Sequence, residues 1–314
     1  MKRLISIAVS LIILAIIYSK IDFSGLIKVF QNCNGWWMTI SLGMVVPLTL
    51  ITSWRLQQLM PSGARLGFGE ANRLILAASV LNMVLPSKMG DIAKAYFMKQ
   101  NGHLEGSLSL SLVVFEKACD MLSLLLWCAF GLMLYPSKNW LFWTMTVCIA
   151  VGLIAGVLLL SSLKFFKVFF LIGKAILPKK FKLKLQKIEL GWEEMQAYFW
   201  HDKNQLLKIT FTSISIWFLH LLQIWFFILA LKAWTPLLAN LALAPLAILA
   251  GLLPLTFAGV GTRDAALIAF YQPYFNAPTA AALGLLCTSR YLLPAIGGMP
   301  FLGQYLSTVR NWEK

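Results

Sequence analysis

Charged side chains within apolar stretches are the residues of this sequence most able to carry chemistry. Glu116 and Asp120 lie one helical turn apart on one face of the apolar stretch 108–135, and Arg290 lies ten residues into the stretch 280–308. A charged side chain at the centre of a membrane-spanning helix costs about 2.5–3.5 kcal/mol on insertion scales. Such residues are therefore expected to face a protein interior and to pair with one another.

Two further groups of charged residues accompany proline and glycine breaks in apolar sequence. Pro86 and Gly90 interrupt the first stretch, and Pro254, Gly259 and Gly261 interrupt the second. The charged residues next to these breaks are Lys88, Asp91, Lys94, Arg263 and Asp264. A helix that restarts after either break presents unpaired backbone N–H groups and the positive end of its dipole.

Together these residues predict a binding site for the phosphate of a lipid. Full positive charge would come from Lys88, Lys94, Arg263 and Arg290. The carboxylates that balance these cations, or bind an amine or hydroxyl groups of the ligand, would be those of Asp91, Glu116, Asp120 and Asp264. Thr262 is expected to cap the helix that begins after Gly261. The alternative is an ion-pair network that holds the broken helices together and contacts no ligand.

The composition identifies the class of protein in which such a site would lie. Apolar residues make up 59% of the 314 residues, against about 45–50% in typical proteins, and charged residues make up 12%, against about 25%. Mean hydropathy is +0.76. So few charges exclude a soluble enzyme or a disordered chain, and continuous apolar runs argue against a β-barrel. The sequence predicts an all-α polytopic integral membrane protein with a single transmembrane domain.

Six full membrane spans and two broken elements account for the apolar stretches. Because a span needs about 20 apolar residues, full spans are expected at Leu4–Tyr18, Trp36–Met60, Leu108–Tyr135, Trp140–Leu163, Leu206–Leu231 and Ala280–Thr308. Residues 74–98 and 237–271 each combine an apolar run, a proline–glycine break and a second short helical run. Non-helical backbone at membrane depth is tolerated only beside protein or a water-filled cavity, so both elements are predicted to be re-entrant.

The basic residues predict the orientation. The chain carries 27 Lys and Arg against 12 Asp and Glu, and short loops rich in Lys and Arg stay in the cytoplasm. The Lys-rich segment 164–208, both termini and the group Arg55, Arg65 and Arg73 are therefore expected on the cytoplasmic side of a cell membrane. The two broken elements then enter from opposite faces as an inverted repeat, a pattern typical of transporter sites at the midplane. This rule explains the net charge of +15 without nucleic acid as a partner.

The Lys-rich segment contains a predicted amphipathic helix. Its apolar residues recur at spacings of four and three, at Phe181, Leu185, Ile188, Trp192, Met195 and Phe199. The helix is expected either to lie on an anionic leaflet or to pack beneath the helical bundle, and neither arrangement carries chemistry.

Three motifs in this chain resemble the lysylphosphatidylglycerol synthase transmembrane, or flippase-like, family. They are Leu-Pro-x3-Gly-Asp-x2-Lys at 85–94, Phe-Glu-Lys-x2-Asp at 115–120 and Gly-Val-Gly-Thr-Arg-Asp-Ala at 259–265. The pairs Trp54-Arg55 and Arg290-Tyr291 also fit that pattern, and the resemblance covers residues 4–308. It implies two re-entrant elements that face each other around a lipid-accessible cavity.

The resemblance also implies a function. A flippase or scramblase would move a polar-headed, phosphate-containing lipid between leaflets. The sequence has no Walker A, GxGxxG, GxSxG or HExxH motif, so no enzyme activity, cofactor or metal is expected. Two alternatives stay open: a membrane-embedded glycosyltransferase or acyltransferase with Glu116 and Asp120 as its catalytic pair, and a non-transporting partner of a separate lipid-modifying enzyme. The sequence leaves the oligomeric state open.

Overall fold

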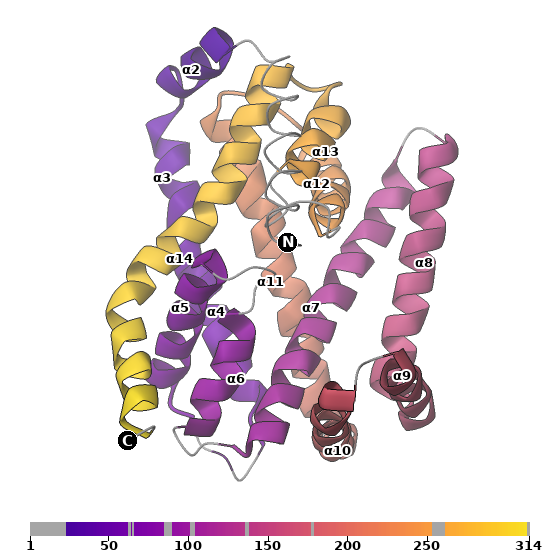
Figure 1. The fold of residues 1–314 in the computed structure, drawn as a ribbon. Helices are drawn as coiled ribbons and strands as arrows, with labels where there is room; N and C mark the ends of the chain where they lie inside the picture. Colours follow the sequence, from indigo (N-terminus) through magenta and orange to yellow (C-terminus); the bar gives the residue numbers. More distant parts are fainter. Residues whose placement is uncertain are drawn as a thin grey trace.

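A computed structural model shows the fold of this chain (Figure 1). It describes residues 23–61, 64, 66–84, 90–100, 104–135, 138–176, 179–252 and 261–312. The predicted span Leu4–Tyr18 lies outside these residues, as do Pro86, Lys88, Pro254 and Gly259. All regular structure within the described residues is helical, which confirms an all-α polytopic membrane protein.

Five segments of the described chain are long and apolar enough to cross a membrane. The first combines α3 (Gly35–Gly43) with α4 (Val45–Leu59). The others lie in α7 (Gly106–Leu134), α8 (Trp140–Ser161), α11 (Lys203–Ala230) and α14 (Ala277–Trp312). Side-chain caps explain several starts, because Asn34, Asn139 and Asp202 each accept a hydrogen bond from the first turn of α3, α8 or α11. A short helix, α2 (Phe23–Gln31), precedes this set.

The two broken elements form helical hairpins. In the first, α5 (Phe68–Val84) packs against α6 (Gly90–Gln100); in the second, α12 (Leu237–Gly251) packs against α13 (Thr262–Tyr271). The return helices have 11 and 10 residues, about 15–17 Å at 1.5 Å per residue, which is too short to cross a bilayer core of about 30 Å. The first element begins at Phe68, six residues before the predicted start at Leu74. Figure 1 shows the two hairpins at opposite ends of the bundle.

The hairpins contact the long helices reciprocally. Helix α5 packs against α14, which follows the second hairpin, and α12 packs against α7, which follows the first. In both contacts a glycine of the long helix lies against a backbone carbonyl of the hairpin helix. A Cβ on Gly298 of α14 would lie 2.1 Å from the oxygen of Leu76, and one on Gly131 of α7 would lie 2.2 Å from the oxygen of Ala242, so neither position has room for a side chain. The helices α4 and α11, which precede the hairpins, also pack together. The bundle is thus built from two corresponding halves.

The Lys-rich segment forms α9 (Leu163–Ile176) and α10 (Lys179–His201). Trp192, Met195 and Phe199 are buried, and the ring of Phe199 stacks on Phe115 of α7 at 4.6 Å between centroids. This half of α10 therefore packs against the bundle. The side chains of Phe181, Leu185 and Ile188 lie outside the described set.

Substitution of Gly90 by alanine tests the close approach of the two helices in the first hairpin. An added Cβ would lie 2.3 Å from the carbonyl oxygen of Ala78 and 2.6 Å from the backbone nitrogen of Asn82. Because neither backbone atom can rotate away, we expect Gly90→Ala to destabilise the protein by about 1–3 kcal/mol and to lower its melting temperature in detergent. The matched control is Gly303→Ala, at a helical position with open space around the glycine. Equal melting temperatures for the two variants would contradict this packing.

Candidate functional site

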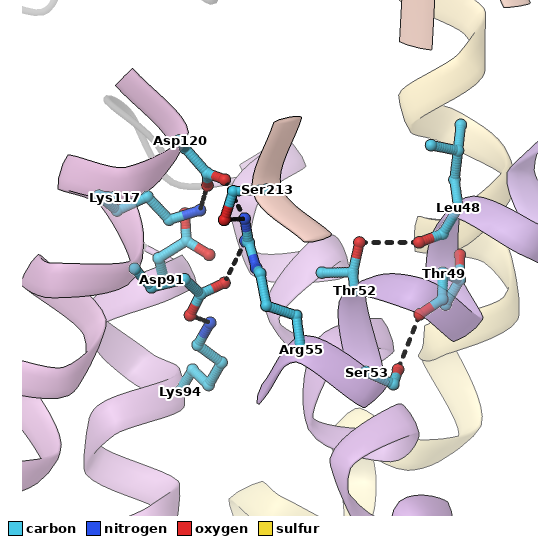
Figure 2. Close-up of polar contacts among 11 residues, drawn as sticks. Leu48, Thr49, Thr52, Ser53, Arg55, Asp91, Lys94, Lys117, Asp120 and Ser213 are labelled. Atoms are coloured by element: carbon cyan, nitrogen blue, oxygen red, sulfur yellow. Dashed lines mark hydrogen bonds and ion pairs between the residues drawn. The ribbon is translucent and has the colours of Figure 1, made fainter. Parts of the chain in front are cut away.

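A network of charged side chains connects α4 with α7 and α11 (Figure 2). Arg55 of α4 donates from Nη2 to Oε1 of Glu116 at 3.1 Å, and from Nη1 to the carboxylate of Asp120. Nη1 also donates to Oγ of Ser213 in α11 at 3.1 Å. The side chains of Arg55 and Glu116 are only 2% and 1% exposed. Glu116 and Asp120 thus meet one guanidinium, as their spacing in α7 predicted.

Two residues of α6 join this network from the first hairpin. Lys94 is fully buried and donates to Oε2 of Glu116, so this carboxylate contacts two cations. Asp91 pairs at 3.2 Å with Nζ of Lys117, which also contacts Asp120 at 3.2 Å. The Lys117 side chain is 44% exposed. The network therefore extends from buried residues to an accessible edge formed by Asp91, Lys117 and Asp120.

The charges in this network balance. Three cations face three carboxylates: Arg55, Lys94 and Lys117 against Asp91, Glu116 and Asp120. Glu116 lies ten residues after the first residue of α7, about 15 Å along the helix axis. A buried charge at that depth is retained where it is paired. The network therefore fastens the first hairpin to three other helices.

The second hairpin carries a separate ion pair. Arg263 donates to Oδ1 of Asp264 from Nε at 3.1 Å and from Nη2 at 2.7 Å. Nη2 also donates to α14, to the backbone oxygen of Gly284 at 2.9 Å and to Oγ1 of Thr288 at 2.6 Å. Arg263 and Asp264 are both buried. This pair holds α13 against α14.

Thr262 was predicted to cap α13, but the structure places the N-cap one residue earlier, at Gly261. Thr262 is the first residue of the helix. The carboxylate of Asp264 accepts a hydrogen bond from the backbone N–H of Gly261 at 3.1 Å. Gly261 has a φ of 102°, which is strained for any residue with a Cβ. Glycine is therefore required where this half-helix begins.

Arg290 takes part in neither group of ion pairs. The residue is 4% exposed. Its Nη2 donates to the hydroxyl of Tyr291 at 3.0 Å, and its guanidinium carbon lies 5.0 Å from the centroid of that ring. Within the described part of the chain, Nε and Nη1 of Arg290 are buried and have no hydrogen-bond partner.

Comparison with known proteins agrees with this architecture. The sequence profile of the lysylphosphatidylglycerol synthase TM region matches residues 3–298. The chain belongs to this family. It is also similar to a UPF0104 membrane protein of Methanocaldococcus jannaschii, with 24% identity over 95% of this chain and 93% of that protein.

The structure describes seven of the eight residues predicted to form the site in this family member; Lys88 lies outside the described residues. One group brings together Asp91, Lys94, Glu116 and Asp120. A second group contains Arg263 and Asp264. Arg290 belongs to neither group. The predicted residues thus separate into a network on the first hairpin, a pair on the second and one arginine in α14.

Arg55 was expected on the cytoplasmic side and was not among the predicted site residues. Arg55 lies inside the first long segment of α3 and α4 and is the residue to which both carboxylates of α7 bind. Its place within the apolar stretch 36–60 is the signal that could have identified it, by the same reasoning that identified Glu116. Lys117 was also not among the predicted site residues, although it lies between Glu116 and Asp120 in sequence.

Neutralisation of Glu116 tests whether the network stabilises the fold of this family member. Glu116→Gln removes the carboxylate that faces both Arg55 and Lys94, so a buried positive charge is left without compensation. Breaking a buried ion pair in this way costs about 3–5 kcal/mol. We expect a large loss of thermal stability in detergent, measured from the unfolding midpoint.

A second substitution restores the charge balance. The double variant Glu116→Gln with Lys94→Met removes one charge of each sign, so it should recover a large part of the lost stability. Glu105→Gln is the matched control, because Glu105 is exposed at the start of α7. If Glu116→Gln unfolds at the same temperature as Glu105→Gln, the network contributes no stability.

Proposed function

We propose that this protein moves a polar-headed lipid between the two leaflets of a membrane, as a flippase or scramblase, and leaves its covalent structure unchanged. The observation that carries the proposal is the placement of two short hairpins at opposite ends of the bundle, each with charged residues that contact the long helices (Figure 1). Broken helices in corresponding halves are typical of transporters with a site at the midplane. Membership of a family named for lysylphosphatidylglycerol supports a lipid-related function.

The accessible edge of the network offers polar contacts to a headgroup. The side chains of Asp91 and Asp120 are 15% and 20% exposed, and that of Lys117 is 44% exposed. The acyl chains of a moving lipid can stay in the bilayer, so only the headgroup needs polar partners. A phosphate could bind Lys117, and an amine or hydroxyl group could bind the carboxylates. We therefore propose a phosphate-containing lipid as the substrate.

We also propose an orientation in the cell membrane. Helices α9 and α10 lie at the same end of the bundle as α6 and the C-terminal end of α14 (Figure 1). This end is rich in lysine, and a hydrogen bond to Glu193 raises the pKa of Lys167 above its ordinary value, so Lys167 stays cationic at neutral pH. By the positive-inside rule, this end and both termini face the cytoplasm, and the first hairpin enters from that side.

Translocation can be measured with purified protein in liposomes that contain a phospholipid with a fluorescent headgroup. Bleaching by a membrane-impermeant reductant reports the rate at which inner-leaflet lipid reaches the outer leaflet. We expect the protein to accelerate this exchange and Asp91→Asn to slow it by about tenfold, equivalent to roughly 1.4 kcal/mol in the barrier. The reason is that Asp91 is accessible and its loss changes the charge that the headgroup meets.

The control for this experiment is Glu193→Gln, an equally conservative change in the exposed pair with Lys167. Glu193→Gln should keep the thermal stability of the unaltered protein, because exposed ion pairs contribute only about 0–1 kcal/mol. Asp91→Asn removes one carboxylate of the balanced network, so its exchange rate is compared at equal amounts of folded protein. Liposomes that exchange lipid no faster with protein than without it would contradict the proposal. Recovery of a covalently altered lipid, detected by mass spectrometry, would favour a membrane enzyme instead.

A further inference from the structure

Arg290 is a buried cation without a described counter-ion. The four carboxylates among the candidate residues are already engaged: those of Asp91, Glu116 and Asp120 within the network, and that of Asp264 with Arg263. The two break segments, 85–89 and 253–260, contain no Asp or Glu in their sequences. Whereas the network balances three cations with three carboxylates, Arg263, Asp264 and Arg290 together carry one positive charge in excess.

In the region that the structure describes, Arg290 lacks hydrogen-bond acceptors for some of its donors, just as it lacks a counter-ion for its charge. Nη2 has the Tyr291 hydroxyl as acceptor, but the buried Nε and Nη1 have no acceptor within the described residues. Buried polar groups in native proteins almost always have a partner, and an exception calls for an explanation such as strain, a catalytic role, or a bound water or ion. A guanidinium presents its donors in a planar fork that matches the oxygens of a phosphate. The missing partner therefore has the chemistry of an anion with several acceptor oxygens.

The position of Arg290 in α14 indicates how such an anion would arrive. Arg290 lies thirteen residues from each end of the apolar segment Ala277–Gly303, at the middle of a membrane span. The next residues along the helix, Tyr291, Leu292 and Leu293, are 37%, 46% and 40% exposed. Tyr291 thus contacts Arg290 and is itself partly exposed, next to the exposed Leu292 and Leu293.

We propose that Arg290 binds the phosphate of a lipid headgroup at the middle of the membrane, through the donors that the protein leaves unpaired. This inference rests on the proposed lipid translocation and assigns the anion-binding step at the middle of the membrane to one residue. The balanced network of Arg55, Lys94 and Glu116 keeps the hairpin in place, whereas Arg290 remains unneutralised until a substrate arrives. Free inorganic phosphate has the same chemistry, so the test must separate the two sources.

The proposal predicts opposite signs for two variants in protein stripped of lipid. Arg290→Met removes a buried charge without a partner, so its melting temperature in detergent should equal or exceed that of the unaltered protein. Glu116→Gln breaks a buried pair, so its melting temperature should fall. If Arg290→Met lowers the melting temperature as much as Glu116→Gln does, Arg290 has a structural role and the proposal is wrong.

Binding is measured by native mass spectrometry with three probes: phosphatidylglycerol, diacylglycerol of the same chains, and inorganic phosphate. We expect the unaltered protein to bind phosphatidylglycerol at least tenfold more tightly than diacylglycerol, and Arg290→Met to lose that preference. Arg290→Lys keeps the charge but not the planar fork, so it should retain an intermediate preference. Lys167→Met, at an exposed surface lysine, is the control and should bind as the unaltered protein does.

Three binding results would overturn the proposal. Equal binding of phosphatidylglycerol and diacylglycerol would show that the phosphate is not recognised, and an unchanged preference in Arg290→Met would assign recognition to another residue. Displacement of phosphatidylglycerol by millimolar inorganic phosphate would identify a free anion as the ligand. Because these measurements report binding alone, they remain valid if liposomes show no translocation. Translocation that is unchanged in Arg290→Met would leave the proposed function intact and contradict only the assignment to Arg290.

Discussion

Compensation of charge where water is absent is the constraint on which this structure depends. A bilayer offers no solvent to a carboxylate or guanidinium, so each needs a partner from the protein or from a ligand. The protein meets this requirement with Glu116, which contacts Arg55 on one side and Lys94 on the other. The three residues come from α7, α4 and α6, so that charge pairing and helix packing specify the same arrangement.

The same constraint explains the form of the hairpins. A helix that stops inside the membrane leaves backbone groups without intrahelical partners. At the second hairpin, the Asp264 carboxylate accepts from the backbone of Gly261 while it pairs with Arg263, which in turn donates to α14. One ion pair thus caps a half-helix and anchors it. The reciprocal contacts of α5 with α14 and of α12 with α7 then place the two hairpins in corresponding positions of the two halves.

The fold was largely predictable because its signals are local. Long apolar stretches predicted the spans, and a proline followed by glycine predicted each hairpin. The charged residues within these stretches predicted most of the site, since a membrane makes an isolated charge costly. The partners of those charges were less predictable, because pairing depends on how distant helices pack. Arg55 lies 61 residues from Glu116 in sequence, and no spacing rule connects them.

Arg290 shows where sequence and structure contribute different information. The amino-acid sequence identifies Arg290 as a charged residue within a span, as it does Glu116 and Asp120. Only the structure shows that the others are paired while two donors of Arg290 are not. The difference separates residues that hold the hairpins from one that can receive a ligand, although all are charged residues within apolar spans.

The most direct test of the account is the position of lipid phosphates in an experimental structure of the protein in a phospholipid nanodisc. The account predicts phosphate density beside the guanidinium of Arg290, midway between the two headgroup layers. Phosphate density confined to those two layers, with protein side chains or acyl chains filling the space at Arg290, would contradict it.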